Sequence, residues 1–378
     1  MKVVEIPVIQ KTAPRCAFIA DDLTGACDAA APFKLRGART IVCIKELSST
    51  SHEVVALSTE SRDLDICAAR ERIREAAARL AALDPTIVFK KIDSTLRGNI
   101  GAEIAMVLEA FGCDFAIITP AFPSLGRLIR NGRLHLEGDA GWQPIGIADR
   151  LRAQGLGDCV HLASDVLERA IESGQRFISV EAACDGDLDA IVAATFRFGR
   201  RVLYAGSAGL AAAVAKMFFG SMQRASPHEA MQMPCIFCVG SDHPVTLGQL
   251  SALSRERPVE WFAAGSAQPE SLAGCLQSGH HAVVTVSRGA DCGAMRELLE
   301  SAGRCAALLL SGGDTAFLVC SALGTEAIEI EGEIAIGLPW GRLRGGLLDG
   351  LAVATKSGGF GASDALIRVA DFFTCQAN

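Results

Sequence analysis

Short apolar runs alternate along this chain with longer stretches in which apolar residues recur at helical spacing. The short runs are typical of buried strands, and the longer Ala- and Leu-rich stretches are typical of amphipathic helices. Because the two kinds alternate, the pattern predicts an α/β fold in which mainly parallel sheets are covered by helices. The predicted strands are 16–20, 40–44, 54–58, 87–91, 115–119, 235–239, 282–286 and 306–310, and the predicted helices are 27–36, 68–83, 101–112 and 208–218.

The length of 378 residues exceeds the size at which a single hydrophobic core stops growing, so two domains are expected. The segment 219–234 is rich in Gly, Ser and Pro, follows a strongly helical stretch and precedes a predicted strand. We therefore place a boundary near residue 225, which gives a larger domain over 1–225 and a smaller one over 226–378.

Charge and hydropathy exclude several classes of protein. The chain carries 36 Lys and Arg against 43 Asp and Glu, and a net charge of −7 disfavours general binding to nucleic acid or to anionic membranes. No apolar stretch approaches the roughly 20 residues that span a bilayer, and residues 1–12 lack the apolar segment of a signal peptide. We expect a cytoplasmic protein with neither a membrane nor a nucleic-acid partner.

The 14 cysteines are scattered, often in apolar segments, as expected of small buried residues in a reducing compartment. One Cys-x-x-Cys pair, Cys235 and Cys238, lies inside a predicted strand and has no second pair or His partner at metal-binding spacing. We expect no metal site formed by side chains alone.

Ligands in parallel α/β sheets bind beyond the carboxyl ends of the strands, so the loops that follow strands carry the candidate chemistry. Asp21-Asp22-Leu23-Thr24-Gly25 directly follows a predicted strand. Either Asp22 or Thr24 could cap the next helix, but two adjacent carboxylates exceed what a cap needs. The segment therefore favours a site over a simple cap.

Two further loops add basic groups. Arg62 follows the strand 54–58 and could grip a carboxylate through paired hydrogen bonds, or form a surface ion pair with Glu60 or Asp63. Lys90-Lys91-Ile92-Asp93-Ser94-Thr95-Leu96-Arg97-Gly98-Asn99 is the densest polar cluster of the chain. A solvated loop with a capping Ser94 would explain only one or two of these residues, so the cluster indicates a functional site.

Glycine-rich loops mark the second half of the chain. In Gly312-Gly313-Asp314-Thr315, a strand leads through two glycines into a helix start, which presents free N–H groups to a phosphate. Alone the signal is weak, because Asp-Thr is also a fair cap. Gly358-Gly359-Phe360-Gly361 and Gly240-Ser241 add two more candidate loops, whereas G-x-x-x-x-G-K-[ST] and G-x-G-x-x-G are both absent.

The motifs together resemble the four-carbon acid sugar kinase family. Ile-Ala-Asp-Asp-Leu-Thr-Gly-Ala at 19–26 is similar to the amino-terminal signature of that family, and 91–99 is similar to its second signature. Pro120-Ala121-Phe122-Pro123 with Gly126-Arg127 and Asn131-Gly132, then 206–210, 312–316 and 356–361, continue the pattern in order. The resemblance extends from about residue 16 to the C-terminus.

The resemblance implies a two-domain, ATP-dependent and Mg²⁺-dependent kinase of threonate, erythronate or 3-oxo-tetronate, with its active site in the cleft between the domains. The first domain would bind the acid and the second the nucleotide. The implied acid-binding residues are Asp21, Asp22, Arg62, Lys91, Ile92, Asp93, Ser94 and Arg97, and the implied ATP-binding residues are Ser241, Gly312, Gly313, Asp314, Thr315, Gly358 and Gly359.

Phosphoryl transfer requires positioning and charge neutralisation more than covalent chemistry. On that basis Arg62 and Lys91 are expected to bind the substrate carboxylate. Asp93, or failing that Asp22, would accept the hydroxyl proton as the catalytic residue, and Asp314 would help to place Mg²⁺.

Two alternatives stay open at this point. The stretch between Ser241 and Gly312 is short for the family, which leaves room for a non-catalytic sensor of a sugar acid or a nucleotide. The other alternative is a different small-molecule transferase or a dehydrogenase on an α/β frame, and the missing dinucleotide fingerprint argues against NAD. Assembly into a homo-oligomer is also left open.

Overall fold

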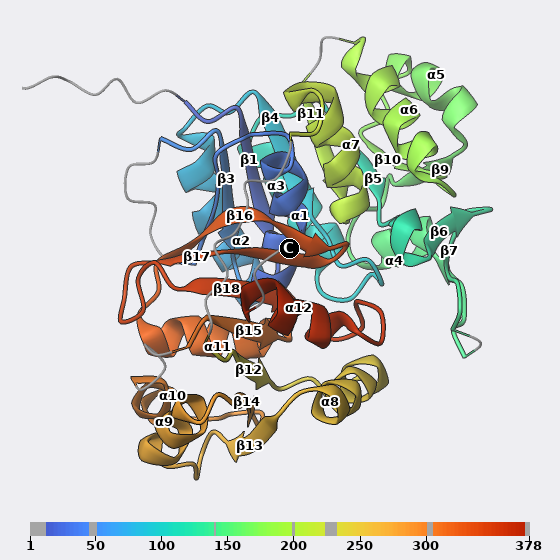
Figure 1. The fold of residues 1–378 in the computed structure, drawn as a ribbon. Helices are drawn as coiled ribbons and strands as arrows, with labels where there is room; N and C mark the ends of the chain where they lie inside the picture. The colour runs from blue at the N-terminus through green and yellow to red at the C-terminus, as the bar shows by residue number, and fades with distance from the viewer. Residues whose placement is uncertain are drawn as a thin grey trace, which may run out of the picture.

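A computed structural model describes residues 13–44, 51–139, 141–198, 201–223, 233–300 and 305–374. Within these ranges, one 15-stranded sheet runs through both halves of the molecule, in the order β13-β14-β12-β15-β18-β17-β16-β2-β3-β1-β4-β11-β5-β10-β9 (Figure 1). Helices cover the sheet on both faces, so the α/β class predicted from the alternation of strands and helices is confirmed.

The N-terminal half contributes eight of these strands, all paired in parallel with one another. Helices α1 and α6 both pack against α7 on one face of the sheet, and α2 packs against α3 on the other. The strands are β1 Cys16–Ala20, β2 Thr40–Cys43, β3 Val54–Ser58, β4 Ile87–Lys91, β5 Phe115–Thr119, β9 Val160–Leu162, β10 Phe177–Val180 and β11 Val202–Gly206. The helices are α1 Leu23–Lys34, α2 Ile66–Ala81, α3 Ile100–Ala110, α4 Ile147–Ala153, α5 Leu167–Glu172, α6 Asp185–Phe196 and α7 Ala208–Phe219.

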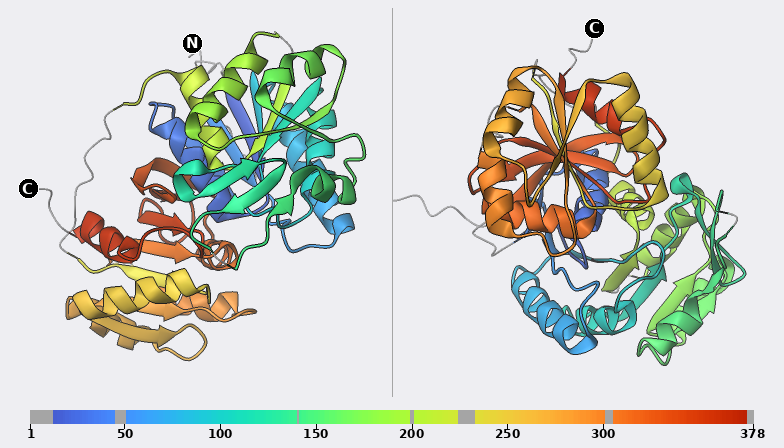
Figure 2. Two further views of the ribbon diagram at one scale, coloured as in Figure 1. Left: turned by 90° about the vertical axis from the view of Figure 1, so that its right-hand side faces the viewer. Right: turned by 90° about the horizontal axis from the view of Figure 1, so that it is seen from below.

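The C-terminal half combines parallel and antiparallel strands, and its twisted sheet is seen edge-on with helices on either side (right panel of Figure 2). β17 runs antiparallel to both β16 and β18, while the other pairs are parallel. The strands are β12 Ile236–Val239, β13 Val259–Ala263, β14 His281–Thr285, β15 Ala307–Ser311, β16 Ala327–Ala335, β17 Leu338–Arg344 and β18 Ala352–Lys356. The helices are α8 Pro244–Glu256, α9 Pro269–Gln277, α10 Cys292–Leu299, α11 Gly313–Leu323 and α12 Ala365–Thr374.

The hairpin β16–β17 joins the two halves. β16 pairs antiparallel with β2, with Ile328 opposite Val42 and Ile330 opposite Thr40, so the sheet continues without a break. Helix α1 belongs to the N-terminal half but also packs against β16, β17, β18 and α11. The alternation of strands and helices predicted mainly parallel sheets, and it gave no sign of this antiparallel junction.

A small antiparallel sheet lies beside the N-terminal half and was likewise not predicted. It consists of β6 Arg127–Arg130, β7 Arg133–Leu136 and β8 Ile145–Gly146, and it follows the 3-10 turn Pro123–Leu125. The segment that leads into this sheet contacts the loop after β18. There the rings of Phe122 and Phe360 pack edge to face, with their centroids 6.2 Å apart.

Most predicted strands and helices lie where expected, to within a few residues. The boundary near residue 225 falls in 224–232, outside the described residues; α7 ends at Phe219 and β12 begins at Ile236. Cys235 and Cys238 are both buried but pack into different clusters of the core. Searched over the described ranges, no helix combines the length and the apolar character that a membrane crossing requires.

Candidate active site

Two carboxylates at the end of β1 are held by one arginine. Asp22 is the N-cap of α1, and its Oδ1 accepts from the Gly25 N–H at 3.0 Å. Arg62 follows β3, the neighbour of β1, and donates four hydrogen bonds of 2.8–2.9 Å, two to Asp21 and two to Asp22. Asp22 is therefore both a cap and part of a charged cluster. Arg62 forms neither of the surface ion pairs considered as an alternative.

This charge balance explains how Asp21 stays ionised although it is buried. Burial alone would raise its pKa, but the positive charges of Arg62, Lys90 and Lys91 together lower it. Most N–H donors of Arg62 are already occupied by the two aspartates. The expected role of Arg62 in binding a substrate carboxylate therefore stays a prediction, and its observed role is to hold Asp21 and Asp22 in place.

The two lysines at the end of β4 differ in their partners. The side chain of Lys90 is fully buried and its Nζ lies 2.8 Å from Glu103, which also accepts from Ser61. Lys91 Nζ donates to the Ile92 carbonyl at 2.9 Å and lies beside the first turn of α1. Lys90 is thus part of a closed buried ion pair, whereas Lys91 faces the Asp22 cluster.

Glycine is needed where α1 passes this cluster. A Cβ at Gly25 would lie 2.3 Å from Asp22 Oδ1 and 3.0 Å from Lys91 Nζ. Gly25 therefore allows the aspartate and the lysine to approach the helix closely.

The carboxylate of Asp93 is surrounded by donors. It accepts from the backbone N–H groups of Thr95 and Arg97, from the Thr95 hydroxyl, and from Arg97 Nε and Nη2 at 2.9 and 2.7 Å. Burial would raise its pKa, but the hydrogen bonds of Arg97 and the charge of Arg62 hold it well below the usual range. A carboxylate occupied in this way is a weak proton acceptor. Ser94 is buried and does not cap α3, whose N-cap is Asn99.

The glycine loop after β15 lies against the aspartate cluster of the other half. Gly312 has a φ of +102°, which an L side chain rarely adopts, and α11 begins at the next residue. A Cβ at Gly313 would lie 2.7 Å from Asp22 Oδ2. The hydroxyls of Thr24 on α1 and Ser357 after β18 lie 3.5 Å apart. The structure therefore brings together the polar loops that the sequence places about 290 residues apart.

All three glycine loops of the C-terminal half meet. A Cβ at Gly240 would lie 2.3 Å from Thr315 Oγ1, and a Cβ at Gly358 would lie 2.2 Å from Ser241 Oγ. Gly359 lies next to the ring of His243, and Asp314 is exposed in the first turn of α11. Backbone N–H groups and hydroxyls thus converge at the positive end of a helix, which is the arrangement that binds phosphate.

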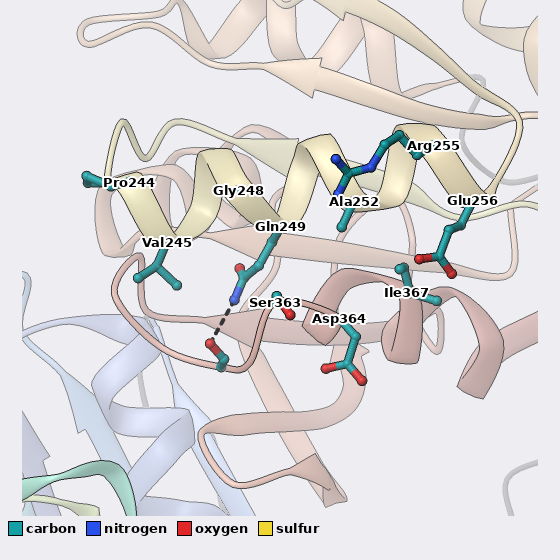
Figure 3. Close-up of a pocket in the computed structure, with 11 residues that line it drawn as sticks. Pro244, Val245, Gly248, Gln249, Ala252, Arg255, Glu256, Ser363, Asp364 and Ile367 are labelled. Atoms are coloured by element: carbon teal, nitrogen blue, oxygen red, sulfur yellow. Dashed lines mark hydrogen bonds between the residues drawn. The ribbon is translucent and has the colours of Figure 1, made fainter. Parts of the chain in front are cut away.

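Two buried side chains that were not predicted, Lys356 and Gln249, donate hydrogen bonds to backbone carbonyls of the loop after β18. Lys356 Nζ donates to the Thr246 hydroxyl and to the carbonyls of Ser357 and Gly358, each at 3.0 Å. Burial lowers the pKa of Lys356 to about 8. Gln249 reaches from α8 to the carbonyls of residues 360–362 (Figure 3). A lysine directly before a glycine loop was visible in the sequence, but its inward orientation was not.

A cavity of about 740 Å³ extends from Gly240 and Ser241 along α8 to Trp261 on β13. Its wall is largely apolar and includes Leu250 and Val286. A second cavity of about 410 Å³ lies between α8 and the start of α12, on the other side of α8 (Figure 3). The first cavity begins at the Gly240–Ser241 loop, whereas the second touches the last glycine loop at Gly361.

Comparison with known families and proteins agrees with this division into halves. A family model described as a sugar-binding N-terminal domain matches residues 16–214, more than half of the chain, and one described as a nucleotide-binding C-terminal domain matches 280–366. The chain belongs to the four-carbon acid sugar kinase family. The relatives that match this chain are named as kinases of sugar acids, which supports a sugar-acid kinase. The segment 90–99 and the aspartate loop lie in the first match, and Gly312–Thr315 and Gly358 lie in the second.

Named relatives cover almost the whole chain. A D-threonate kinase of Bordetella bronchiseptica is 30% identical, over 94% of this chain and 97% of the relative. A D-erythronate kinase of Heliobacterium modesticaldum is 26% identical, over 94% of this chain and 96% of the relative. A crystal structure of a Haemophilus influenzae protein matches the fold with a TM-score of 0.71 at 22% identity, over 94% of this chain and all of that one.

Proposed function

We propose that this protein is an ATP-dependent kinase that transfers the γ-phosphoryl group to a hydroxyl of a four-carbon sugar acid such as threonate or erythronate. The observation that carries the proposal is the close approach of Asp22 to Gly313. An acidic and basic cluster of the sugar-binding half lies directly against the helix N-terminus and glycine loops of the nucleotide-binding half.

The nucleotide is proposed to lie along the C-terminal half. Its phosphates would bind at the N-terminus of α11, between Ser241 and Gly358. Glycine is needed at Gly240 and Gly358, because a Cβ at either position would collide with the hydroxyl of Thr315 or Ser241. The adenosine would occupy the 740 Å³ cavity that begins at Ser241 and ends at Trp261.

Magnesium is proposed to bind mainly through the nucleotide phosphates. Over the described ranges, no three His, Cys, Asp or Glu side chains are grouped so that they could hold a metal ion. Mg²⁺ commonly binds through one or two carboxylates plus substrate phosphates, so the exposed Asp314 beside the α11 N-terminus fits this requirement. The ion would neutralise charge on the phosphate oxygens.

The residues of the aspartate cluster are proposed to position the reacting groups and to accept the proton. Arg62 fixes Asp21 and Asp22, and Lys91 supplies a positive charge beside them. During transfer the acceptor oxygen forms a bond to the γ-phosphorus, the bond between that phosphorus and the β–γ bridging oxygen breaks, and the hydroxyl proton passes to a carboxylate. Asp22 and Asp93 both accept several hydrogen bonds, but Asp22 lies beside Gly313 at the proposed phosphate site, so we assign the proton to Asp22.

The test is an ADP-release screen of the purified protein with four- and five-carbon sugar acids, with Mg²⁺ and with a chelator. We expect release that requires both an acid and Mg²⁺, with four-carbon acids preferred. ADP release that is absent with every acid, together with calorimetric binding of an acid alone, would support the sensor alternative instead.

A further inference from the structure

Most charged groups around Asp22 are paired with one another, which leaves few for a substrate. Arg62 is bonded to Asp21 and Asp22, and Asp93 is bonded to Arg97 and Thr95. A buried charge that lacks a partner is costly, so an unpaired buried group in this region requires an explanation.

Two such groups border the same junction between the halves. Asp28 on α1 is 4% exposed, and its Oδ1 has no hydrogen-bond partner among the residues that the structure describes. Arg127 begins β6, and its buried Nε also lacks a partner within the described ranges. The guanidinium of Arg127 lies over the Phe360 ring, 4.8 Å from its centroid, and so reaches the loop after β18.

The helix geometry directs Asp28 to the proposed site. Residues four apart lie on the same face of a helix, so Asp28 follows Thr24, whose hydroxyl faces Ser357. Burial raises the pKa of Asp28 to about 6, the negative charge of Asp22 acts in the same direction, and Lys91 and Arg127 oppose it. Burial, followed by the negative charge of Asp28, raises the pKa of Glu333 on β16 to about 7.

We propose that Asp28 and Arg127 bind the acceptor acid, with Arg127 taking its carboxylate and Asp28 accepting a hydrogen bond from one of its hydroxyls. This inference rests on the proposed function and names residues for it. Among the residues that the structure describes, neither Arg127 nor Asp28 forms an ion pair, although Arg127 Nη1 donates to the Leu125 carbonyl. A cation and an anion of this kind at one junction match a ligand that carries a carboxylate and hydroxyls, and they distinguish an acid from the corresponding neutral alcohol.

The test compares Arg127→Gln with Arg130→Gln on the same strand. The Arg130 side chain is 55% exposed and forms a surface ion pair with Glu137 at 3.6 Å, so Arg130 serves as a matched control. The assays are ADP release with threonate, erythronate and the neutral alcohol threitol, and calorimetric binding of threonate.

We expect Arg127→Gln to raise the KM for the acid by a factor of about 10–100 while the KM for ATP changes less than twofold. The preference for acid over threitol should fall by a similar factor. Arg127→Lys should recover part of the loss, and Arg130→Gln should match the wild type. Asp28→Asn should raise the acid KM about tenfold, again with little effect on ATP.

The inference is overturned if Arg127→Gln and Asp28→Asn keep the wild-type KM for the acid, or if the KM values for acid and ATP rise together. If the wild type phosphorylates no acid, the proposed function fails, and calorimetry still decides whether Arg127 and Asp28 bind threonate. A variant that does not fold is recognised by its circular dichroism, and Arg127→Lys then provides the test.

Discussion

Glu60 carries the most unusual backbone and charge state in the aspartate cluster. It is a non-glycine residue with a φ of +47°, and its carboxyl accepts a hydrogen bond from Ser58. Burial, followed by the negative charge of Asp22, raises its pKa from 4.5 to about 8. The folded state therefore binds this proton more tightly than the unfolded state, so the stabilisation is complete below pH 4.5 and is lost as the pH rises through 8.

We therefore expect Glu60→Gln to remove part of this loss. The variant should unfold at the wild-type temperature at pH 5 and a few degrees higher at pH 8, because its amide stays neutral. Thermal melts at the two pH values measure the difference. If the melting temperatures of the wild type and of Glu60→Gln change by the same amount between pH 5 and 8, Glu60 is already ionised in the folded state.

Substitution of the two candidate catalytic aspartates should have different effects on kcat and on the KM for the acid. Asp22 borders Gly313, whereas Asp93 accepts from five N–H and O–H groups of its own loop. Asp22→Asn should lower kcat at least about 100-fold, and Asp93→Asn should act mainly on the KM for the acid, with less than a tenfold change in kcat. Steady-state kinetics separate the two cases, and the opposite ranking of kcat would restore Asp93 as the proton acceptor.

At the level of elements, the close approach of α1 and α11 depends on one missing side chain. Gly313→Ala places a methyl group 2.7 Å from Asp22 Oδ2, so the aspartate or the helix start must move. We expect kcat/KM for ATP to fall about 10- to 100-fold, since small displacements in a site are costly. Gly274→Ala, in helix α9 with nothing near the added Cβ, is the matched control and should leave activity unchanged. Full activity of Gly313→Ala would place the phosphates elsewhere.

The limits of sequence-based prediction are also visible in particular elements. Apolar runs such as 16–20 and 87–91 were sufficient to locate β1 and β4, because buried parallel strands need continuous apolar residues. The helix 27–36 was predicted too late in the chain: α1 begins at Leu23, directly after its cap Asp22. The alternative in which Ser94 caps a helix, which the sequence disfavoured, does not hold, because the N-cap of α3 is Asn99.

The partners of charged side chains were harder to foresee. The pairing of Arg62 with Asp21 and Asp22 was not foreseen, and it follows because β1 and β3 are neighbours in the sheet. Lys356 was visible before a glycine loop, but its burial follows from the packing of α8 onto that loop. Spacing along a chain predicts which loops share an edge of the sheet, whereas it does not fix which side chains pair there.

For the whole molecule, the decisive feature is the junction of the halves. The sequence predicted two α/β units, and the structure joins them into one sheet through the antiparallel pairing of β16 with β2. This pairing spans almost 300 residues and has no local signal. Helix α1, which packs against both halves, places Asp22 beside α11 because of that junction.

The most direct measurement is the transfer of label from γ-³²P-ATP to threonate or erythronate by the wild type and by Asp22→Asn. We predict that the wild type produces labelled phospho-acid, with little free phosphate when acid is saturating, and that Asp22→Asn produces at least 100-fold less per unit time. Label that appears only as inorganic phosphate, or equal labelling of the acid by both proteins, would contradict phosphoryl transfer from ATP to the acid at the site bordered by Asp22 and the Gly312–Gly313 loop.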